Sequence, residues 1–348
     1  MKKILMMLVA SSSLSLATAQ ESNKMEPFSR QSFAGQAIRE VEAETSGGNI
    51  HVESSSADKT SIEIFVSPAN GKNRSSVSKE ELQKKLDELY NLEIGLNGGK
   101  LTAIAKSKSR KWDRKNSLSI SFKIYVPQSV STQLSTSGGN IVLSRLQGEQ
   151  KITTSGGNLV IDHVKGKLKG TTSGGNIQVK DSEEEIQLTT SGGNILADNC
   201  KGSIKLTTSG GSVSLNKLSG NTEATTSGGN VHADGFNGDL QAHTSGGNIA
   251  INGLSGNLAT GTSGGNVQVA ITNPGKNIKI RNSGGDISLI LPADKGYDLE
   301  LNARKIKTGS LKNFNGKMDE GEISGQLNGG GSKIDVDGHN GNLSLTLK

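Results

Sequence analysis

The feature that most constrains this sequence is a short motif that returns at a constant spacing. Thr-Ser-Gly-Gly, followed by Asn or Ser, occurs eight times at intervals of 18 residues, beginning at Thr136, Thr154, Thr172, Thr190, Thr208, Thr226, Thr244 and Thr262. A degraded copy follows at 282–286, and an isolated early copy begins at Thr45. A fixed period of this kind indicates an architecture in which each repeat stacks on its neighbours.

Within each repeat, apolar residues alternate with other residues. If the Thr is counted as place zero, places five and seven are apolar in all eight units: Ile141 and Leu143, Leu159 and Ile161, Ile177 and Val179, Ile195 and Ala197, Val213 and Leu215, Val231 and Ala233, Ile249 and Ile251, Val267 and Val269. Alternation with a period of two predicts strands with one buried face. We therefore expect these side chains to face inward.

Glycines mark the predicted corners of each repeat. Besides the Gly-Gly pair, place twelve is glycine in six units: Gly148, Gly166, Gly202, Gly220, Gly238 and Gly256. Because glycine adopts positive φ without a Cβ penalty, both places are predicted to be corners. Short strands joined by corners can bury an apolar face only by stacking. The predicted fold is an all-β, single-chain β-solenoid (β-helix) of 18-residue TSGGN coils, with one short helical insertion near the N-terminus.

A column of asparagines follows the glycine pair. In stacked coils these side-chain amides would lie one above another, each able to donate to the next amide and to the corner backbone. Ser212 interrupts the column. We interpret the asparagines as a structural corner ladder rather than as ligand contacts: Asn140, Asn158, Asn176, Asn194, Asn230, Asn248 and Asn266.

The start of the chain resembles an export signal. Residues 1–19 combine Lys2 and Lys3 with an apolar run and small residues before a cleavage point, which is typical of a secretory signal peptide. Residues 20–35 are then expected to form a flexible N-terminus. No later stretch of 18 apolar residues occurs, so we expect no membrane span. The predicted product is exported and is periplasmic, cell-surface or secreted.

Composition limits the function classes. Aromatic residues make up 3% of the chain, which suits a thin core of Ile, Val, Leu and Ala. The formal net charge of +6 is too small to indicate nucleic acid as a partner. The single cysteine, Cys200, has no partner for an internal disulfide and stands at an apolar place, so we interpret it as a core residue.

The region before the regular repeats is less uniform. Residues 36–130 are predicted to form an N-terminal β region with helical and basic-loop insertions, including strand stretches at 92–105 and 118–126. Ser78 followed by Glu81 fits a helix capping box. Four apolar residues then follow at helical spacing: Leu82, Leu86, Leu89 and Tyr90. Residues 131–348 are assigned to the regular β-solenoid and its C-terminal cap, with closing strands at 287–291, 299–301 and 343–347.

These elements together resemble a known family. The strand pair that ends in Ile-Tyr-Val-Pro at 124–127, the Leu-Ser-Thr-Ser-Gly-Gly-Asn-Ile string at 134–141 and the repeated TSGGN coils are similar to a bacterial domain-of-unknown-function family of candidate adhesins. That family is related to auto-transporter adhesin head domains. The resemblance covers about residues 36–348. It implies an envelope β-solenoid and no catalytic residues.

The repeat shows no regular catalytic or metal-binding pattern. Place eight carries Asp162, Asp198 and Asp234, but other residues stand there in alternate units, so these acids are expected two coils apart on a solvated face. Calcium-roll motifs need a regular Asp after the glycines, which is missing. The five histidines show no zinc spacing and no Ser-His-Asp pattern. We predict no enzyme activity, no metal site and no cofactor.

Two outward features remain as candidate contacts. The column before the repeat Thr contains several threonines, which favours either an ordinary strand face or an ice-binding array. The segment 106–115 contains six cations and the only Trp. It is either a solvated loop that protects an end strand or a contact for an anionic polymer, through Lys106, Lys108, Arg110, Lys111, Trp112, Arg114 and Lys115.

The sequence favours a non-enzymatic, exported β-solenoid that acts as an adhesin-like or structural envelope module. Its expected partner is an anionic envelope or matrix polysaccharide, or another envelope protein. The alternatives are a polysaccharide-active enzyme on a β-helix scaffold and an envelope regulatory domain that binds other proteins.

Overall fold

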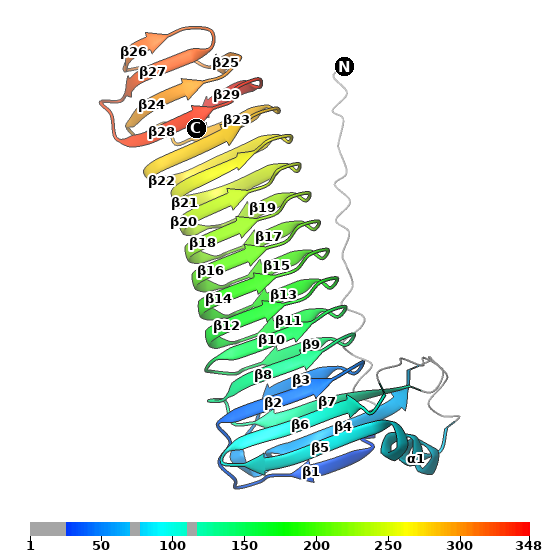
Figure 1. Cartoon of the computed structure of the whole chain (residues 1–348). Coiled ribbons are helices and arrows are strands. Elements are labelled where there is room, and N and C mark those ends of the chain that lie inside the picture. The colour runs from blue at the N-terminus through cyan, green and yellow to red at the C-terminus, as the bar shows by residue number, and fades with distance from the viewer. Residues whose placement is uncertain (1–25, 70–76, 110–116) are drawn as a thin grey trace, which may run out of the picture.

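The chain forms a long β-solenoid whose coils stack in register (Figure 1). The computed structural model describes residues 26–69, 77–109 and 117–348. Each regular coil contributes one strand to each of two parallel columns, and the TSGGN corner joins the two strands. The all-β solenoid predicted from the sequence is confirmed, including an 18-residue step between register partners such as Thr136 and Thr154.

The first column contains the strands that follow the TSGGN corner. They are β3 (Ile50–Ser54), β9 (Ile141–Ser144), β11 (Leu159–Asp162), β13 (Ile177–Lys180), β15 (Ile195–Asp198), β17 (Val213–Asn216), β19 (Val231–Asp234) and β23 (Ile287–Leu291). The second column contains β2 (Glu40–Thr45), β8 (Ser131–Thr136), β10 (Gln150–Thr154), β12 (Lys165–Thr171), β14 (Glu183–Thr189), β16 (Lys201–Thr207), β18 (Ser219–Thr225) and β20 (Asn237–His243). Two long strands, β21 (Ile249–Thr262) and β22 (Val267–Asn282), take part in both columns.

The core runs along the axis of the rod. Places five and seven face inward as predicted, and Ile195 and Ile249 are each 1% exposed. The thiol-bearing Cys200 is also 1% exposed and lies in the same core, which confirms the interpretation from its place in the repeat. Because each coil is too thin to bury these residues alone, the apolar contacts between coils stabilise the stack.

The early TSGGN copy is a full coil of the rod. Strand β2 pairs in parallel with β8, and Thr45 is the register partner of Thr136, 91 positions later. On its other side this coil contacts β6 (Lys100–Ser107) and β7 (Leu118–Val126). The chain therefore leaves the stack after β3, builds the end of the rod and then resumes next to its own first coil.

The C-terminal end repeats this arrangement. Strands β28 (Ser332–Asp337) and β29 (Asn342–Leu347) lie between β22 and β23 on one side and β24 (Tyr297–Asn302) and β25 (Lys305–Thr308) on the other. The antiparallel strands β26 (Phe314–Met318) and β27 (Glu322–Leu327) cover that end. The three closing strands predicted from the sequence fall within β23, β24 and β29.

Antiparallel strands and a helix cover the N-terminal end. They are β1 (Ser29–Ser32), β4 (Ser61–Pro68), β5 (Tyr90–Asn97), the short 3-10 helix η2 (Ala57–Lys59) and α1 (Lys79–Leu89). The backbone N–H of Glu81 donates to the Ser78 hydroxyl at 3.2 Å, as expected for an N-cap. At both ends of the described stack the parallel coils therefore give way to antiparallel pairs, β5 with β6 at one end and β24 with β27 at the other.

Two details at this end differ from the sequence prediction. Tyr90 ends the helix and begins β5, where its buried hydroxyl bonds both the backbone O and N–H of Leu118, so it does not extend the helical face. The single strand expected at 92–105 is a hairpin of β5 and β6. Its turn is Gly98-Gly99, and both glycines have positive φ.

The glycines of the TSGG corner have a different role from the one predicted. None of these paired glycines in the eight units has positive φ, so left-handed backbone does not explain them. The second glycine is required by close stacking: a Cβ on Gly193 would lie 1.9 Å from the carbonyl oxygen of Gly175. A Cβ on the neighbouring Gly192 would make only an ordinary contact, 3.7 Å from the Ser173 oxygen.

The left-handed corner residues stand at the opposite corner of the coil. Place twelve has positive φ in the six predicted glycines. Place nine is also left-handed in successive coils, although five of its residues are not glycine: Arg145, His163, Asp181, Asn199, Lys217, Gly235 and Gly253. A non-glycine residue in this region carries local backbone strain.

Candidate functional site

Two residues of the predicted cationic segment, Lys106 and Lys108, are described by the structure and lie at the N-terminal end of the rod. Lys106 is in β6, and its Nζ is 3.1 Å from the Glu44 carboxylate. The Nζ of Lys108 donates to the backbone oxygen of Asp87 near the end of α1. The structure therefore places these two cations in contacts within the protein. The other predicted contacts lie outside the described residues: Arg110, Lys111, Trp112, Arg114 and Lys115.

The asparagine column lies on the outside of the TSGGN corner. The Asn140 Oδ1 accepts the backbone N–H of Asn158 at 2.8 Å, and the Asn158 Oδ1 accepts that of Asn176 at the same distance. Where Ser212 interrupts the column, its hydroxyl accepts the N–H of Asn230 at 3.1 Å. We expected each amide to donate to the next amide and to the corner backbone. The contact with the corner backbone is present, but in it each side-chain oxygen accepts a backbone N–H of the next coil.

A second ladder was not predicted from the sequence. The buried Thr154 hydroxyl donates to the backbone oxygen of Gly139 at 2.9 Å and accepts the N–H of Gly157 at 3.2 Å. The repeat Thr makes the same two bonds in all eight units. The constancy of Thr at place zero was the available signal, because a buried hydroxyl needs a partner.

The acids predicted at place eight are separated by other side chains. Asp162 is the register partner of Lys180, which in turn is the partner of Asp198. Asp198 and Asp234 are separated in the same way by Asn216. A pair of carboxylates that converge on one bond, which glycoside hydrolysis requires, does not arise within this row.

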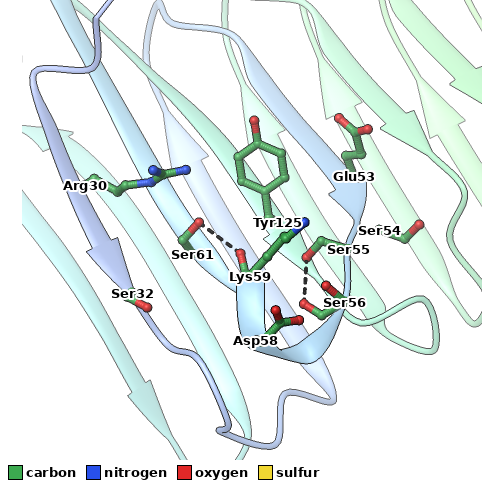
Figure 2. A pocket seen from close by; sticks show the side chains of 10 residues that line it. All are labelled: Arg30, Ser32, Glu53, Ser54, Ser55, Ser56, Asp58, Lys59, Ser61 and Tyr125. Carbon is green, nitrogen blue, oxygen red and sulfur yellow. Dashed lines mark hydrogen bonds between the residues drawn. The ribbon is translucent and has the colours of Figure 1, made fainter.

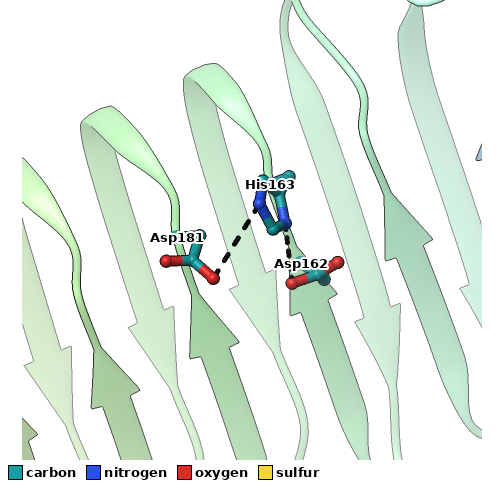
Figure 3. Close-up of side chains that lie close together, drawn as sticks. All are labelled: Asp162, His163 and Asp181. Carbon is teal, nitrogen blue, oxygen red and sulfur yellow. Dashed lines mark ion pairs between the residues drawn. The ribbon is translucent and has the colours of Figure 1, made fainter.

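One side-chain cluster joins places eight and nine of neighbouring coils (Figure 3). The His163 Nδ1 lies 2.9 Å from Asp162 and its Nε2 lies 3.9 Å from Asp181. Asp181 also accepts a hydrogen bond from Asn199 and lies 3.6 Å from the Lys180 Nζ. The Asn199 bond is the main reason that the pKa of Asp181 is lowered.

This cluster is held by ion pairs. One imidazole nitrogen is nearest Asp162 and the other nearest Asp181, while one ligand atom from each of the three residues lies within 4.8 Å of the others. Asp181 is further engaged by an amide and an ammonium group. The sequence did not predict this cluster. Its side chains at place nine are oriented by left-handed backbone, and a strand pattern does not bring such side chains together.

A hollow of about 650 Å³ opens on the N-terminal end of the rod (Figure 2). Strands β1, β4, β7 and β3 form its floor, and η2 with the preceding serines forms a wall. Its lining includes Arg30, Glu53, Asp58, Lys59 and the half-buried Tyr125. This hollow was not predicted from the sequence, because its residues come from distant segments.

Comparison with known proteins identifies the family. The Toastrack DUF4097 family model matches residues 56–346, so the chain belongs to the Toastrack family. This match confirms the resemblance seen in the sequence. The early coil formed by β2 and β3 lies before the matched range. No curated protein matches the chain.

Several solved structures are distantly similar. They include a candidate lipid binding protein from Parabacteroides distasonis, with 15% identity, coverage of 76% of this chain and 96% of that chain, and a TM-score of 0.39. A candidate adhesin from Bacteroides fragilis has 13% identity, coverage of 75% and 96%, and a TM-score of 0.30. A candidate cell adhesion protein from Clostridium sporogenes has 10% identity, coverage of 92% and 98%, and a TM-score of 0.19. These scores are too low to transfer a ligand or a role.

No helix among the described residues is long and apolar enough to cross a bilayer.

Proposed function

We propose that this Toastrack protein is a non-enzymatic, exported β-solenoid that acts as an adhesin-like or structural module of the bacterial envelope. The observation that carries the proposal is the continuous parallel pairing of the two strand columns between antiparallel strands at both ends. Such a rod holds its outward residues at a spacing of about 4.8 Å per coil. It is suited to extended contact with a polymer or another protein.

Internal bonding of the corners supports this role. The Thr and Asn ladders use the corner carbonyls and amides within the stack, so the rod does not need a ligand to satisfy them. The outward residues are then available for contacts. The signal-like pattern of residues 1–19 supports export to the periplasm, the cell surface or the medium.

The proposed ligand is an anionic envelope or matrix polysaccharide bound by the cationic segment. Lys106 is already paired with Glu44. The density of cations in the rest of 106–115 favours an anionic partner. Binding through such charges should weaken as salt rises, since exposed charges are screened.

The test combines localisation with binding. The full chain, expressed in a bacterium, should appear in the envelope or medium with a mature N-terminus near Gln20, and the purified mature chain should bind envelope polysaccharide. Replacing Lys108, Arg110, Lys111 and Arg114 by Ser should abolish binding, whereas replacing Lys151 and Lys169 on the coil face should not. Retention in the cytoplasm would contradict export, and full binding by the segment variant would contradict the assigned contact.

A further inference from the structure

We propose that the hollow on the N-terminal end binds a neutral saccharide, with one sugar ring packed against Tyr125 and its hydroxyls bonded to the surrounding polar side chains. This inference deepens the proposed adhesin-like function and rests on it. It concerns a different surface from the cationic segment and a different ligand class from an anionic polymer.

The register of four strands places the groups that would hold the sugar. Tyr125 of β7 is the partner of Ser61 in β4 on one side and of Glu53 in β3 on the other. Ser61 is in turn the partner of Ser32 in β1. Four adjacent strands thus place a hydroxyl, a second hydroxyl, an aromatic ring and a carboxylate in one row that lines the hollow. Ser61 is 5% exposed, and its hydroxyl donates to the Lys59 backbone oxygen at 3.2 Å, so it lies at the floor of the hollow. Figure 2 shows the ring between Arg30 and Glu53.

The flanking charges are held by neighbours on the rod. The Arg30 guanidinium lies 2.9 Å from the Glu63 carboxylate in the next strand. Glu53 pairs with Arg145 and lies 3.6 Å from the His51 imidazole. Side chains restrained in this way lose less conformational freedom when they bind a ligand.

The wall of the hollow adds one acceptor and one donor. Asp58 and Lys59 are neighbours in η2 and line the hollow together with serines 54–56. A hydrogen bond with Ser56 is the first cause of the lowered pKa of Asp58, so its carboxylate stays an acceptor at neutral pH. Sugar hydroxyls both donate and accept, and therefore suit a site of this mixed kind.

The balance of charge and polarity decides the ligand class. The lining has two cations, Arg30 and Lys59, and two carboxylates, Glu53 and Asp58, so it has no net charge of its own that would select a polyanion. Outside the lining, the Lys123 Nζ lies 5.1 Å from the centre of the Tyr125 ring. Its serines and charges also do not suit an acyl chain, because burying these groups without partners is unfavourable. An aromatic ring among hydrogen-bonding groups favours a flat, hydroxyl-rich ligand. The volume of about 650 Å³ lies within the range typical of small-molecule sites.

Affinity electrophoresis with soluble neutral polysaccharides tests the proposal. The mature chain is run through gels that contain dextran, laminarin, galactomannan or xyloglucan, and a glycan array identifies the preferred sugar. We expect retardation by at least one polymer. Tyr125→Ser should weaken binding at least tenfold, Tyr125→Phe should retain most of it, and the control Lys151→Ser should leave it unchanged.

A second variant guards against loss of folding. Asp58→Asn with Lys59→Ser changes only the exposed η2 wall and should also weaken binding, at unchanged thermal stability. Absence of neutral-sugar binding, or full binding by both the Tyr125→Ser and wall variants, would overturn the proposal. Neutral-sugar binding should persist at high salt. The proposed function instead predicts salt-sensitive binding of polyanions that is abolished by substitutions in the cationic segment. The two experiments therefore show separately whether the sugar site or the polyanion contact has failed.

Discussion

The hydroxyl of Thr154 joins two successive coils, because it donates to the backbone oxygen of Gly139 at 2.9 Å while it accepts the N–H of Gly157 in its own coil. Both groups lie at the corner, where the strand ladders are interrupted. The same residue thus closes its own turn and fixes it to the turn before. This bond pair explains why a polar residue occupies a buried place in every unit.

Two buried threonines should respond to the same substitution with opposite signs. Thr190 bonds the Gly175 oxygen at 2.8 Å and the Gly193 N–H at 3.2 Å, whereas the buried Thr222 Oγ1 has no hydrogen-bond partner among the described residues. Thr190→Val should therefore destabilise the protein by about 1–3 kcal/mol, and Thr222→Val should stabilise it by about 1 kcal/mol. Thermal and urea unfolding measure both. Equal effects would contradict the assigned role of the Thr ladder.

The adjacent glycines of one corner should differ in the same experiment. A Cβ on Gly193 would overlap the Gly175 carbonyl at 1.9 Å, while a Cβ on Gly192 lies 3.7 Å from its nearest neighbour. Gly193→Ala should lower the free energy of unfolding by about 2–3 kcal/mol, and Gly192→Ala should change it by less than about 0.5 kcal/mol. If both variants unfold alike, coil stacking does not explain the second glycine.

His51 should make stability depend on pH. Burial is the main cause of its lowered pKa; Lys123 and Arg145 lower it further, and Glu53 opposes the shift. Above pH 6.5, the ordinary pKa of histidine, the imidazole is neutral in both the folded and the unfolded chain, and the stabilisation is fully present. As pH falls from 6.5 through the lowered folded pKa, the unfolded chain binds a proton first, and stability is lost.

The measurement compares unfolding at pH 7.5 and pH 5.5. His51→Gln should show a smaller decrease between these pH values than the unsubstituted chain. His243→Gln is the control, because His243 is exposed on β20. An identical decrease in the His51 variant would show that other groups cause the acid response.

Cys200 should not react with thiol reagents while the coils remain stacked. Burial raises the pKa of its thiol to about 11, and the residue is 1% exposed. A thiol reagent at pH 8 should therefore modify it only in denaturant, because the thiolate is the reactive form. Cys200→Ser with Ser203→Cys moves the thiol to an exposed place in β16 and should react at once. Rapid modification of native Cys200 would indicate that the coils open locally.

The repeat allowed the regular coils to be predicted, but the reasons for some of its residues came only from the structure. Alternation at places five and seven fixed the inward face of Ile195 and its equivalents. The glycine pair looked like a left-handed turn, yet close approach between coils requires its second member. Sequence spacing also cannot reveal left-handed backbone at Arg145 or Lys217, where no glycine marks it.

The ends of the rod were less predictable for a topological reason. Strand pairing within the array joins units 18 residues apart, whereas Thr45 pairs with Thr136 across a long excursion. The candidate sugar site depends on that excursion, since Tyr125 and Glu53 become neighbours only when β7 and β3 lie side by side. No local pattern encodes this pairing.

Cross-linking across the excursion tests the central claim, that the early TSGGN copy is a coil of the rod. Glu42 and Gln133 are register partners on the outside of β2 and β8, so cysteines there should lie within disulfide range. In a Cys200→Ser background, Glu42→Cys with Gln133→Cys should form an internal disulfide under mild oxidation. Glu42→Cys with Lys151→Cys, one coil further along, should not. Failure of the first pair, or equal cross-linking of both, would contradict the account.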